Sequence, residues 1–390
     1  MSDSVWHQRA PSLAASLMGA LAAARRVGLL FWLVAALPAM PGTASADNRD
    51  VPPWPTVWQA SELGDHPLVG KIWSRELRGF VSPQDYGTTL AKTRFILLGE
   101  VHDNPDHHRL QAWAIRTVSK LRGARIVEGA PQMDVVAMEM LTADEQAGLD
   151  RFYGRNARVP RPRTAADFGR LMKWEKLGWP DYKIYQPIIE EALRASLVIT
   201  PASPARSENR KVSRDGFKAL GETETKRLGL DTPLDKNLAA ALADEIRDSH
   251  CGMLPETALP NMSLVQRLRD ASMADAMLQS ESKGAALIAG NGHVRHDRGV
   301  PWYLAERAIP DRQIVAVRHI EVEDGKTDIS DYGLSEGGAA SQLADFVVFT
   351  PRQPRTEPCE EMRRQMEAIN TRHKAKDAAT DSGSALGSKP

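Results

Sequence analysis

Short apolar runs alternate with longer amphipathic segments over most of this chain. The run TRFILLGE (93–100) is almost uninterrupted, and PDHHRLQAWAIRTVSKL (105–121) follows with apolar residues at helical spacing. Continuous apolar runs of this length are typical of strands buried in a parallel sheet, and proline is favoured in the first turn of a helix. The alternation predicts an α/β fold, with a mainly parallel sheet flanked by helices.

The same pattern continues toward the C-terminus. Further strands are expected at 134–141, 196–202, 285–290, 312–322 and 345–350, and further helices at about 144–153, 182–196 and 263–278. The charged, helix-prone segment from about 204 to 262 interrupts the alternation. We interpret it as a helical insertion beside the sheet and a candidate lid. Hydrophobic residues make up 42% of the chain, which is ample for one large core.

The first 46 residues have the features of a signal peptide. Two arginines precede the apolar run 27–37, and Ala-Ser-Ala at 44–46 is the small-residue pattern that signal peptidase cuts. The run is shorter than the roughly 20 residues that span a bilayer. We therefore predict cleavage before Asp47 and a periplasmic protein. No cysteine lies near the cleavage site, so a lipid-anchored form is not expected.

The remaining chain divides into three parts. Residues 47–69 are rich in proline and tryptophan and are expected to lie on the surface of the domain, which extends over 70–355. Residues 356–390 are expected to be mostly disordered, because the end of the chain lacks apolar periodicity.

Cysteine use and charge limit the classes of partner. Cys251 and Cys359 are the two cysteines, and neither has the CxxC spacing of a zinc or redox site. An oxidising compartment permits a disulfide between them, and two separate buried thiols are the alternative. Lys plus Arg and Asp plus Glu each total 50, and no long basic block is present. No nucleic-acid partner is expected.

Two of the expected strands end in the same motif. Gly99-Glu100-Val101-His102 follows the first apolar run, and Gly290-Asn291-Gly292-His293 follows the run at 285–290. Because the carboxyl ends of parallel strands meet at one edge of a sheet, both histidines are expected to converge on one pocket.

Glu139 lies inside the apolar strand at 134–141. A buried carboxylate is costly unless it is paired, so Glu139 needs a partner. His102 or His293 is the natural candidate. The alternative is that Glu139 anchors a neighbouring loop or an arginine.

Imidazole and carboxylate groups at one site allow two kinds of chemistry. His102, Glu139 and His293 could hold a divalent metal, or they could act as general acid and base while Glu100 or Glu139 activates a water. The chain contains no G-x-S-x-G or HExxH motif and no phosphate-binding glycine loop. A serine-nucleophile hydrolase and a dinucleotide-binding enzyme are therefore not supported.

The residues around the first motif have more than one interpretation. Asp103 and Asn104 are as well explained by capping the helix that follows as by binding a ligand. His107 and His108 lie in the first helical turn and face different sides. At most one of them is expected to point toward the strand ends, with the other solvated.

The segment GNGHVRHDRGVPW (290–302) places Arg295, His296 and Arg298 after the second motif. Arginines beside a pocket commonly bind a carboxylate or phosphate. A solvated loop is the alternative.

Four segments together resemble the ChaN-like haem-binding family, within the Tiki/TraB/erythromycin-esterase superfamily that is marked by two Gly-x-x-His motifs. They are LLGEVHDNPDHHRLQ, AMEML, QRLRDASMADAML and LIAGNGHVRHDRGVPWYL, and the resemblance runs from about residue 70 to about 355. It implies an exported protein that handles haem or iron. It also implies an α/β core, haem held between the subunits of a homodimer, and an outer-membrane haem receptor as a partner. The best-known member is a lipoprotein, and this chain departs from it in lacking the lipid-bearing cysteine.

The resemblance also suggests site residues. Ferric haem with an oxygen-anion ligand favours tyrosine, and Tyr182 and Tyr185 are the first candidates, with Tyr153 and Tyr303 kept open. The haem propionates would be bound by arginines such as Arg295 or Arg298, with His296 beside them. Relatives thought to cleave peptides or an ester imply the alternative function, a metal-dependent hydrolase that uses His102, Glu139 and His293.

Overall fold

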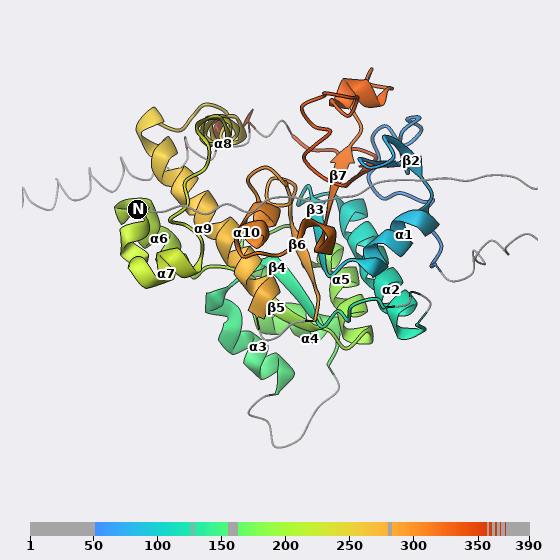
Figure 1. Ribbon diagram of the computed structural model, residues 1–390, viewed down its shortest axis with the longest axis horizontal. Coiled ribbons are helices and arrows are strands. Elements are labelled where there is room, and N and C mark those ends of the chain that lie inside the picture. The colour runs from blue at the N-terminus through green and yellow to red at the C-terminus, as the bar shows by residue number, and fades with distance from the viewer. Residues whose placement is uncertain are drawn as a thin grey trace, which may run out of the picture. The chain divides into compact units, whose positions relative to one another are not determined.

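An eight-stranded sheet runs through the described part of the chain (Figure 1). The strand order is β2-β1-β8-β7-β3-β6-β4-β5. The six strands from β8 to β5 are mutually parallel, whereas β1 is antiparallel to both β8 and β2. The bounds are β1 Ile72–Ser74, β2 Gly79–Val81, β3 Phe95–Glu100, β4 Val135–Thr142, β5 Val198–Ser203, β6 Ala285–Gly290, β7 Ile314–Glu321 and β8 Phe346–Thr350. The predicted α/β fold with a mainly parallel sheet is confirmed.

The computed structural model describes residues 51–371 except for short gaps at 126, 128, 155–162, 280–282, 357–358, 361–362, 365–366 and 368–370. The expected signal peptide and most of the expected disordered tail therefore lie outside the described residues. No helix in the described ranges is both long and apolar enough to cross a membrane.

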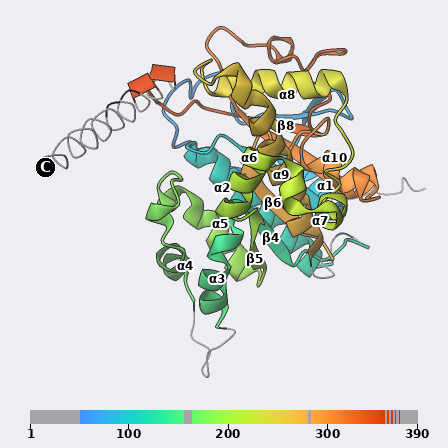
Figure 2. The same cartoon turned by 90° about the vertical axis from the view of Figure 1, so that its left-hand side faces the viewer.

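Helices cover both faces of the sheet (Figures 1 and 2). One core lies between the sheet and α1 to α5, and a second lies between the sheet and α6, α9 and α10. The bounds are α1 Pro83–Lys92, α2 Pro105–Gly123, α3 Gln146–Tyr153, α4 Ala165–Met172, α5 Tyr182–Arg194, α6 Arg206–Asp215, α7 Glu222–Arg227, α8 Lys236–Ser249, α9 Leu259–Leu278 and α10 Val300–Glu306.

Strand β3 shows why continuous apolar runs form the centre of this sheet. Ile96 and Leu98 belong to the first core, and Phe95 and Leu97 belong to the second. Both faces of the strand are buried, so no polar alternation is needed. Helix α2 then starts as its sequence indicates, because the Asn104 side chain accepts the Asp106 N–H and Pro105 occupies the first turn.

Elements near the N-terminus were not expected from the sequence. Strands β1 and β2 have three residues each, which is too short to show a period-two pattern. Their place is set by pairing, since β1 joins the edge of the sheet beside β8. Helix α1 does carry a readable start, because Ser82 caps it by accepting the Asp85 N–H.

The expected helical insertion contains α6, α7, α8 and the start of α9. A disulfide between Cys251 and Cys359 joins the turn after α8 to the segment that follows β8, with 5.5 Å between the Cα atoms. Of the two alternatives for the cysteines, the structure has the disulfide.

Candidate functional site

The carboxyl ends of β3, β6 and β4 bring four of the candidate residues together. These strands are neighbours in the sheet, and Glu100 lies opposite Gly290 in the register of β3 and β6. Glu139 lies between the two motif histidines: its Oε1 is 3.3 Å from His293 Nε2, and its Oε2 is 3.9 Å from His102 Nε2. Residues that are far apart in the sequence therefore form one cluster, which we call the strand-end cluster (Glu100, His102, Glu139 and His293).

A carboxylate orients each histidine through its Nδ1 atom. His102 Nδ1 lies 2.8 Å from Glu100 Oε1, and His293 Nδ1 lies 2.6 Å from Asp270 Oδ1. Both Nε2 atoms consequently face Glu139. Asp270 comes from α9 and was not recognised in the sequence. Its only signal there is an acid directly beside the apolar stripe of QRLRDASMADAML.

Irregular backbone pairing accompanies the position of Glu139. The register between β4 and β5 shifts between Met138 and Thr142, and the pairing of β4 with β6 ends at Met138. The Glu139 carboxylate accepts the Gly290 N–H at 2.7 Å and forms an ion pair with Arg269. Both interpretations of this buried acid therefore apply, since it faces the histidines and also binds an arginine and a loop amide.

Helices α2 and α5 hold Glu100 from the other side. Gln111 Nε2 donates to Glu100 Oε2 at 2.8 Å, and the Tyr185 hydroxyl lies 3.2 Å from Glu100 Oε1. His108 Nδ1 lies 3.2 Å from Glu100 Oε2. This carboxylate is fully enclosed by polar partners, which is what a buried charge requires.

Electrostatic pairing keeps the cluster charged. Burial raises the pKa of Glu139, but His293 and Arg269 outweigh this and hold the pKa well below its usual value. Burial lowers the pKa of His293, but Glu139 and Asp270 raise it to about 9. The pKa of Glu100 is likewise lowered, because His108 and His102 outweigh the effect of burial. Carboxylates and a protonated imidazole therefore coexist at neutral pH.

The cluster is a network of ion pairs, not a ready-made set of metal ligands. Within the residues that the structure describes, no group of three or more His, Cys, Asp or Glu side chains is arranged to hold a metal ion. The oxygens of Glu139 are already bound by Arg269 and the Gly290 N–H, and His293 lies between two carboxylates.

The tyrosines proposed as iron ligands point into the protein. The Tyr185 hydroxyl is also 3.1 Å from His102 O, and the Tyr182 hydroxyl donates to Ala165 O. Burial raises the pKa of both phenols, which disfavours the tyrosinate that ferric iron would bind. In this structure the fully buried Tyr185 side chain supports Glu100, and its role as an iron ligand stays a prediction.

The other two candidate iron ligands, Tyr153 and Tyr303, also form hydrogen bonds within the protein. Tyr153 accepts the Ile199 N–H at 2.7 Å, and Tyr303 accepts from Arg267 Nε at 3.0 Å.

The cations after the second motif are paired with acids of the same chain. Arg295 binds Asp297, Arg298 binds Glu245, and His296 Nε2 lies 2.8 Å from Asp345 Oδ2. Arg298 is buried, so the alternative of a solvated loop is wrong for this residue.

The expectation that His107 or His108 is solvated is also wrong. Both are fully buried. His107 Nδ1 accepts the Val101 N–H, and His108 Nε2 lies 3.0 Å from His102 O. The first turn of α2 lies directly against the end of β3, so polar side chains there bind the loop instead of water. Asp103, in contrast, lies at the surface and pairs with Arg355.

We expect the stability of the protein to depend on pH through His293. Its folded pKa of about 9 exceeds the unfolded value near 6.5, so its contribution is fully present below pH 6.5 and is lost as pH rises through 9. A tenfold difference in proton affinity is about 1.4 kcal/mol, so the free energy of unfolding should fall by about 3 kcal/mol over this window. Urea unfolding at several pH values would measure it.

The matched variant for this test is His293→Gln, which cannot titrate. Its unfolding free energy should fall less between pH 6.5 and 9 than that of the wild type. Equal slopes would contradict the assignment.

The protein should also lose stability at acidic pH, for a different reason. Burial lowers the pKa of His319 to about 4, so the contribution of the neutral His319 side chain to the free energy of unfolding is lost as pH falls from 6.5 to 4.

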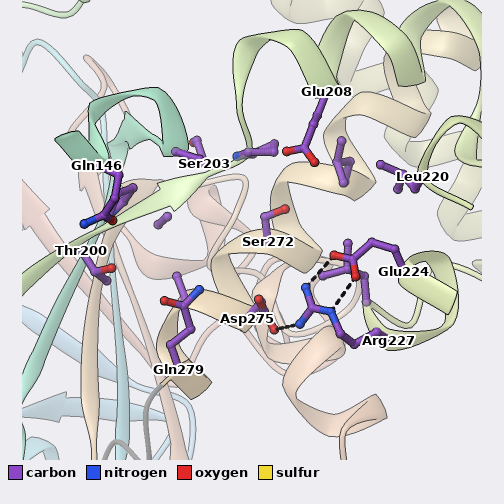
Figure 3. Close-up of a pocket in the computed structure, with 17 residues that line it drawn as sticks. Gln146, Thr200, Ser203, Glu208, Leu220, Glu224, Arg227, Ser272, Asp275 and Gln279 are labelled. Carbon is purple, nitrogen blue, oxygen red and sulfur yellow. Dashed lines mark hydrogen bonds and ion pairs between the residues drawn. The ribbon is translucent and has the colours of Figure 1, made fainter.

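A cavity of about 370 Å³ lies elsewhere, between the end of β5, α6, α7 and α9 (Figure 3). Figure 3 shows Arg227 held between Glu224 and Asp275 on one side of it. None of its lining residues belongs to the strand-end cluster. Ser203 connects the two, because it lines the cavity and its hydroxyl donates to Glu139 O at 2.7 Å.

Comparisons with known proteins agree with the fold. A family model described as "Haem-binding uptake, Tiki superfamily, ChaN" matches residues 88–304, more than half of the chain. Among solved structures, ChaN of Campylobacter jejuni with cofacially bound heme is 22% identical, with a TM-score of 0.53 over 71% of this chain and 95% of that chain. At this identity the likeness shows the fold alone.

Two further structures are more distant and carry no argument. The type III effector HopBA1 is 9% identical, with a TM-score of 0.38 over 69% of this chain and 92% of that chain. A mutant of the erythromycin esterase EreC in its open conformation is 12% identical, with a TM-score of 0.34 over 71% and 95%. No curated protein matches the chain significantly.

Proposed function

Because this chain belongs to the ChaN haem-binding uptake family of the Tiki superfamily, we propose that it binds haem in the periplasm as part of iron uptake. The periplasmic location rests on the expected signal peptide at 1–46. The Campylobacter jejuni relative is described as binding heme cofacially, and we extend that arrangement to a homodimer of this chain. We include an outer-membrane haem receptor as a further partner in this proposal.

His102 is the side chain of the strand-end cluster that best fits haem iron. Its side chain is 35% exposed, compared with 7% for His293, and its ring lies 4.8 Å from that of the half-buried Trp179. Glu100 binds Nδ1, so Nε2 is the nitrogen left for a ligand; among the residues that the structure describes, its nearest acidic oxygen is Glu139 Oε2 at 3.9 Å. A carboxylate that fixes the ring of a ligating histidine is a common supporting arrangement. This half-exposed, oriented imidazole carries the proposal.

The residues around His102 have separate roles in this proposal. Glu100 orients the ring, and the Tyr185 hydroxyl fixes Glu100. Trp179 supplies an apolar aromatic face beside the ring. Bound haem would supply a ferric iron that accepts one imidazole nitrogen. Glu100 and Glu139 raise the pKa of His102 against the effect of burial. Only the neutral ring can bind iron through Nε2, so binding should strengthen as pH rises through this pKa.

Titration of the purified protein with ferric haem, followed by the Soret band, tests this proposal. We expect saturable binding with an imidazole-type spectrum. His102→Ala should lower the affinity at least about 100-fold, because it removes the ligand itself and not merely its supporting partner. Tyr182→Phe is the control and should bind as the wild type does, since its hydroxyl donates to Ala165 O and to no residue of the strand-end cluster among the hydrogen bonds of the described residues.

Two results would count against the proposal. A tyrosinate-type spectrum lost in Tyr182→Phe or Tyr185→Phe would return the iron to a tyrosine. Loose, non-saturating binding unaffected by all three substitutions would reject haem binding at this site. The mass of the haem complex in solution separately tests the homodimer.

Hydrolysis is a second candidate function, favoured by one observation. Glu139 lies between two imidazoles that are each oriented through Nδ1 by another carboxylate. Such an arrangement allows a carboxylate to activate water while the imidazolium of His293 donates a proton to the leaving group. An ester and peptide panel tests it: turnover that is absent in Glu139→Gln would support hydrolysis, and turnover that persists in this variant would reject it.

A further inference from the structure

Three arginines gather beside the second Gly-x-x-His motif. Arg295 and Arg298 lie in the loop between β6 and α10, and Arg318 lies in β7. Burial and the charge of Arg295 lower the pKa of Arg318, whose Nε atom has no hydrogen-bond partner. We call these residues the arginine cluster. Two of its three cations have limited exposure, with 17% for Arg295 and 4% for Arg298.

Two carboxylates pair with these arginines, one from the same loop and one from a separate helix. Asp297 belongs to the same loop and binds Arg295 through two N–H groups, at 2.9 Å and 2.6 Å. Glu245 comes from α8, where its Oε2 accepts from Arg295 at 3.0 Å and also from Arg298. The Glu245 side chain is 44% exposed. A buried arginine thus depends on a carboxylate that is already partly in water.

Helix α8 is held to the rest of the protein by a small apolar cluster and by the disulfide in the turn that follows it. It crosses α9 (Figure 2), where Leu242 and Ile246 form a small cluster with Leu259 that is separate from the two cores of the sheet. Space for the Glu245 carboxylate depends on Gly292, because a Cβ atom there would lie 3.0 Å from Glu245 Oε1. The Glu245 carboxylate is partly exposed, so rotation of its side chain can withdraw it. Withdrawal would leave Arg298 without its carboxylate partner, whereas Arg295 would keep Asp297.

We propose that the arginine cluster is a binding site for a carboxylate of the ligand, and that Glu245 occupies it as an internal competitor until the ligand displaces it. The ligand class is a porphyrin propionate, and this part rests on the proposed haem binding. Arg298 and Arg295 exchange one carboxylate for another, so the charge balance of the buried guanidinium is kept. Glu245 becomes solvated, which its exposure already favours.

The test compares two adjacent acids on α8. Glu245→Gln removes the competitor and should raise haem affinity about tenfold, since a hydrogen bond to a charged group is worth about that factor. Asp244→Asn is the matched control, because Asp244 is exposed and pairs with Arg247. Arg298→Gln should lower the affinity about tenfold. Haem dimethyl ester, which lacks the free carboxylates, should bind equally to the wild type and to Glu245→Gln. This comparison does not use the Arg298→Gln variant, so it holds even if that variant fails to fold.

The outcomes separate this inference from haem binding itself. If the wild type binds haem and Glu245→Gln binds no better, the competitor is rejected and the proposed function stands. If the ester shows the same gain as haem, the carboxylate site is rejected. If the wild type binds no haem, the proposed function fails. Iron-free mesoporphyrin then decides the inference: binding gained in Glu245→Gln supports it, and no gain overturns it.

Discussion

Replacing Glu139 with alanine should lower the free energy of unfolding by about 3–5 kcal/mol, the usual cost of removing one partner from a buried ion pair. The substitution leaves the Arg269 guanidinium and the His293 imidazolium without their shared carboxylate, and it leaves the Gly290 N–H without an acceptor. The cavity that it creates adds to this cost. Urea unfolding at neutral pH would measure the change.

A matched control variant and a double-mutant cycle make this test specific to the Glu139–His293 pair. Glu190→Ala removes an exposed acid that accepts a hydrogen bond from Gln186, and its effect should stay within about 0.5 kcal/mol. Combining Glu139→Ala with His293→Gln should cost less than the sum of the two single changes, because they share one interaction. Additive costs would show that Glu139 and His293 do not interact.

Reducing the Cys251–Cys359 disulfide should lower the free energy of unfolding by about 2–5 kcal/mol. The bond closes a loop with a sequence separation of 108 residues, so the oxidised chain loses much conformational entropy in the unfolded state. The two cores contain neither cysteine, so the reduced protein should keep its fold. Unfolding curves with and without reductant would measure the difference.

The double variant Cys251→Ser with Cys359→Ser is the control for the reductant. It should unfold like the reduced wild type and should not respond to the reagent. A wild-type midpoint that does not move on reduction would contradict the expectation and would mean that the bond constrains the folded and unfolded chains equally.

Elements whose signal is local were predictable from the sequence. The runs that became β3 and β6 are continuous and apolar, and both of their faces are buried. The shared Gly-x-x-His ending then placed His102 and His293 at one edge by the general geometry of parallel sheets. Glu139 was recognisable because an acid inside such a run needs a partner.

Features that depend on contacts between distant segments were not predictable. Asp270 orients His293 because α9 packs against the second core. Glu245 binds Arg298 because α8 lies beside the loop between β6 and α10. A single sequence shows neither approach. The surroundings of Tyr185 have a related cause, because the packing of α5 on α2 places its hydroxyl against Glu100.

The strand-end cluster stands where the two cores meet at the edge of the sheet. His102 lies beside Trp179 and Tyr185 on the side of the first core, whereas His293 is oriented by α9 on the side of the second. The positions of the two imidazoles around Glu139 therefore depend on both helix layers. Because packed interiors transmit strain, a packing change deep in either core can alter one of the two imidazole–Glu139 distances without touching any residue of the cluster.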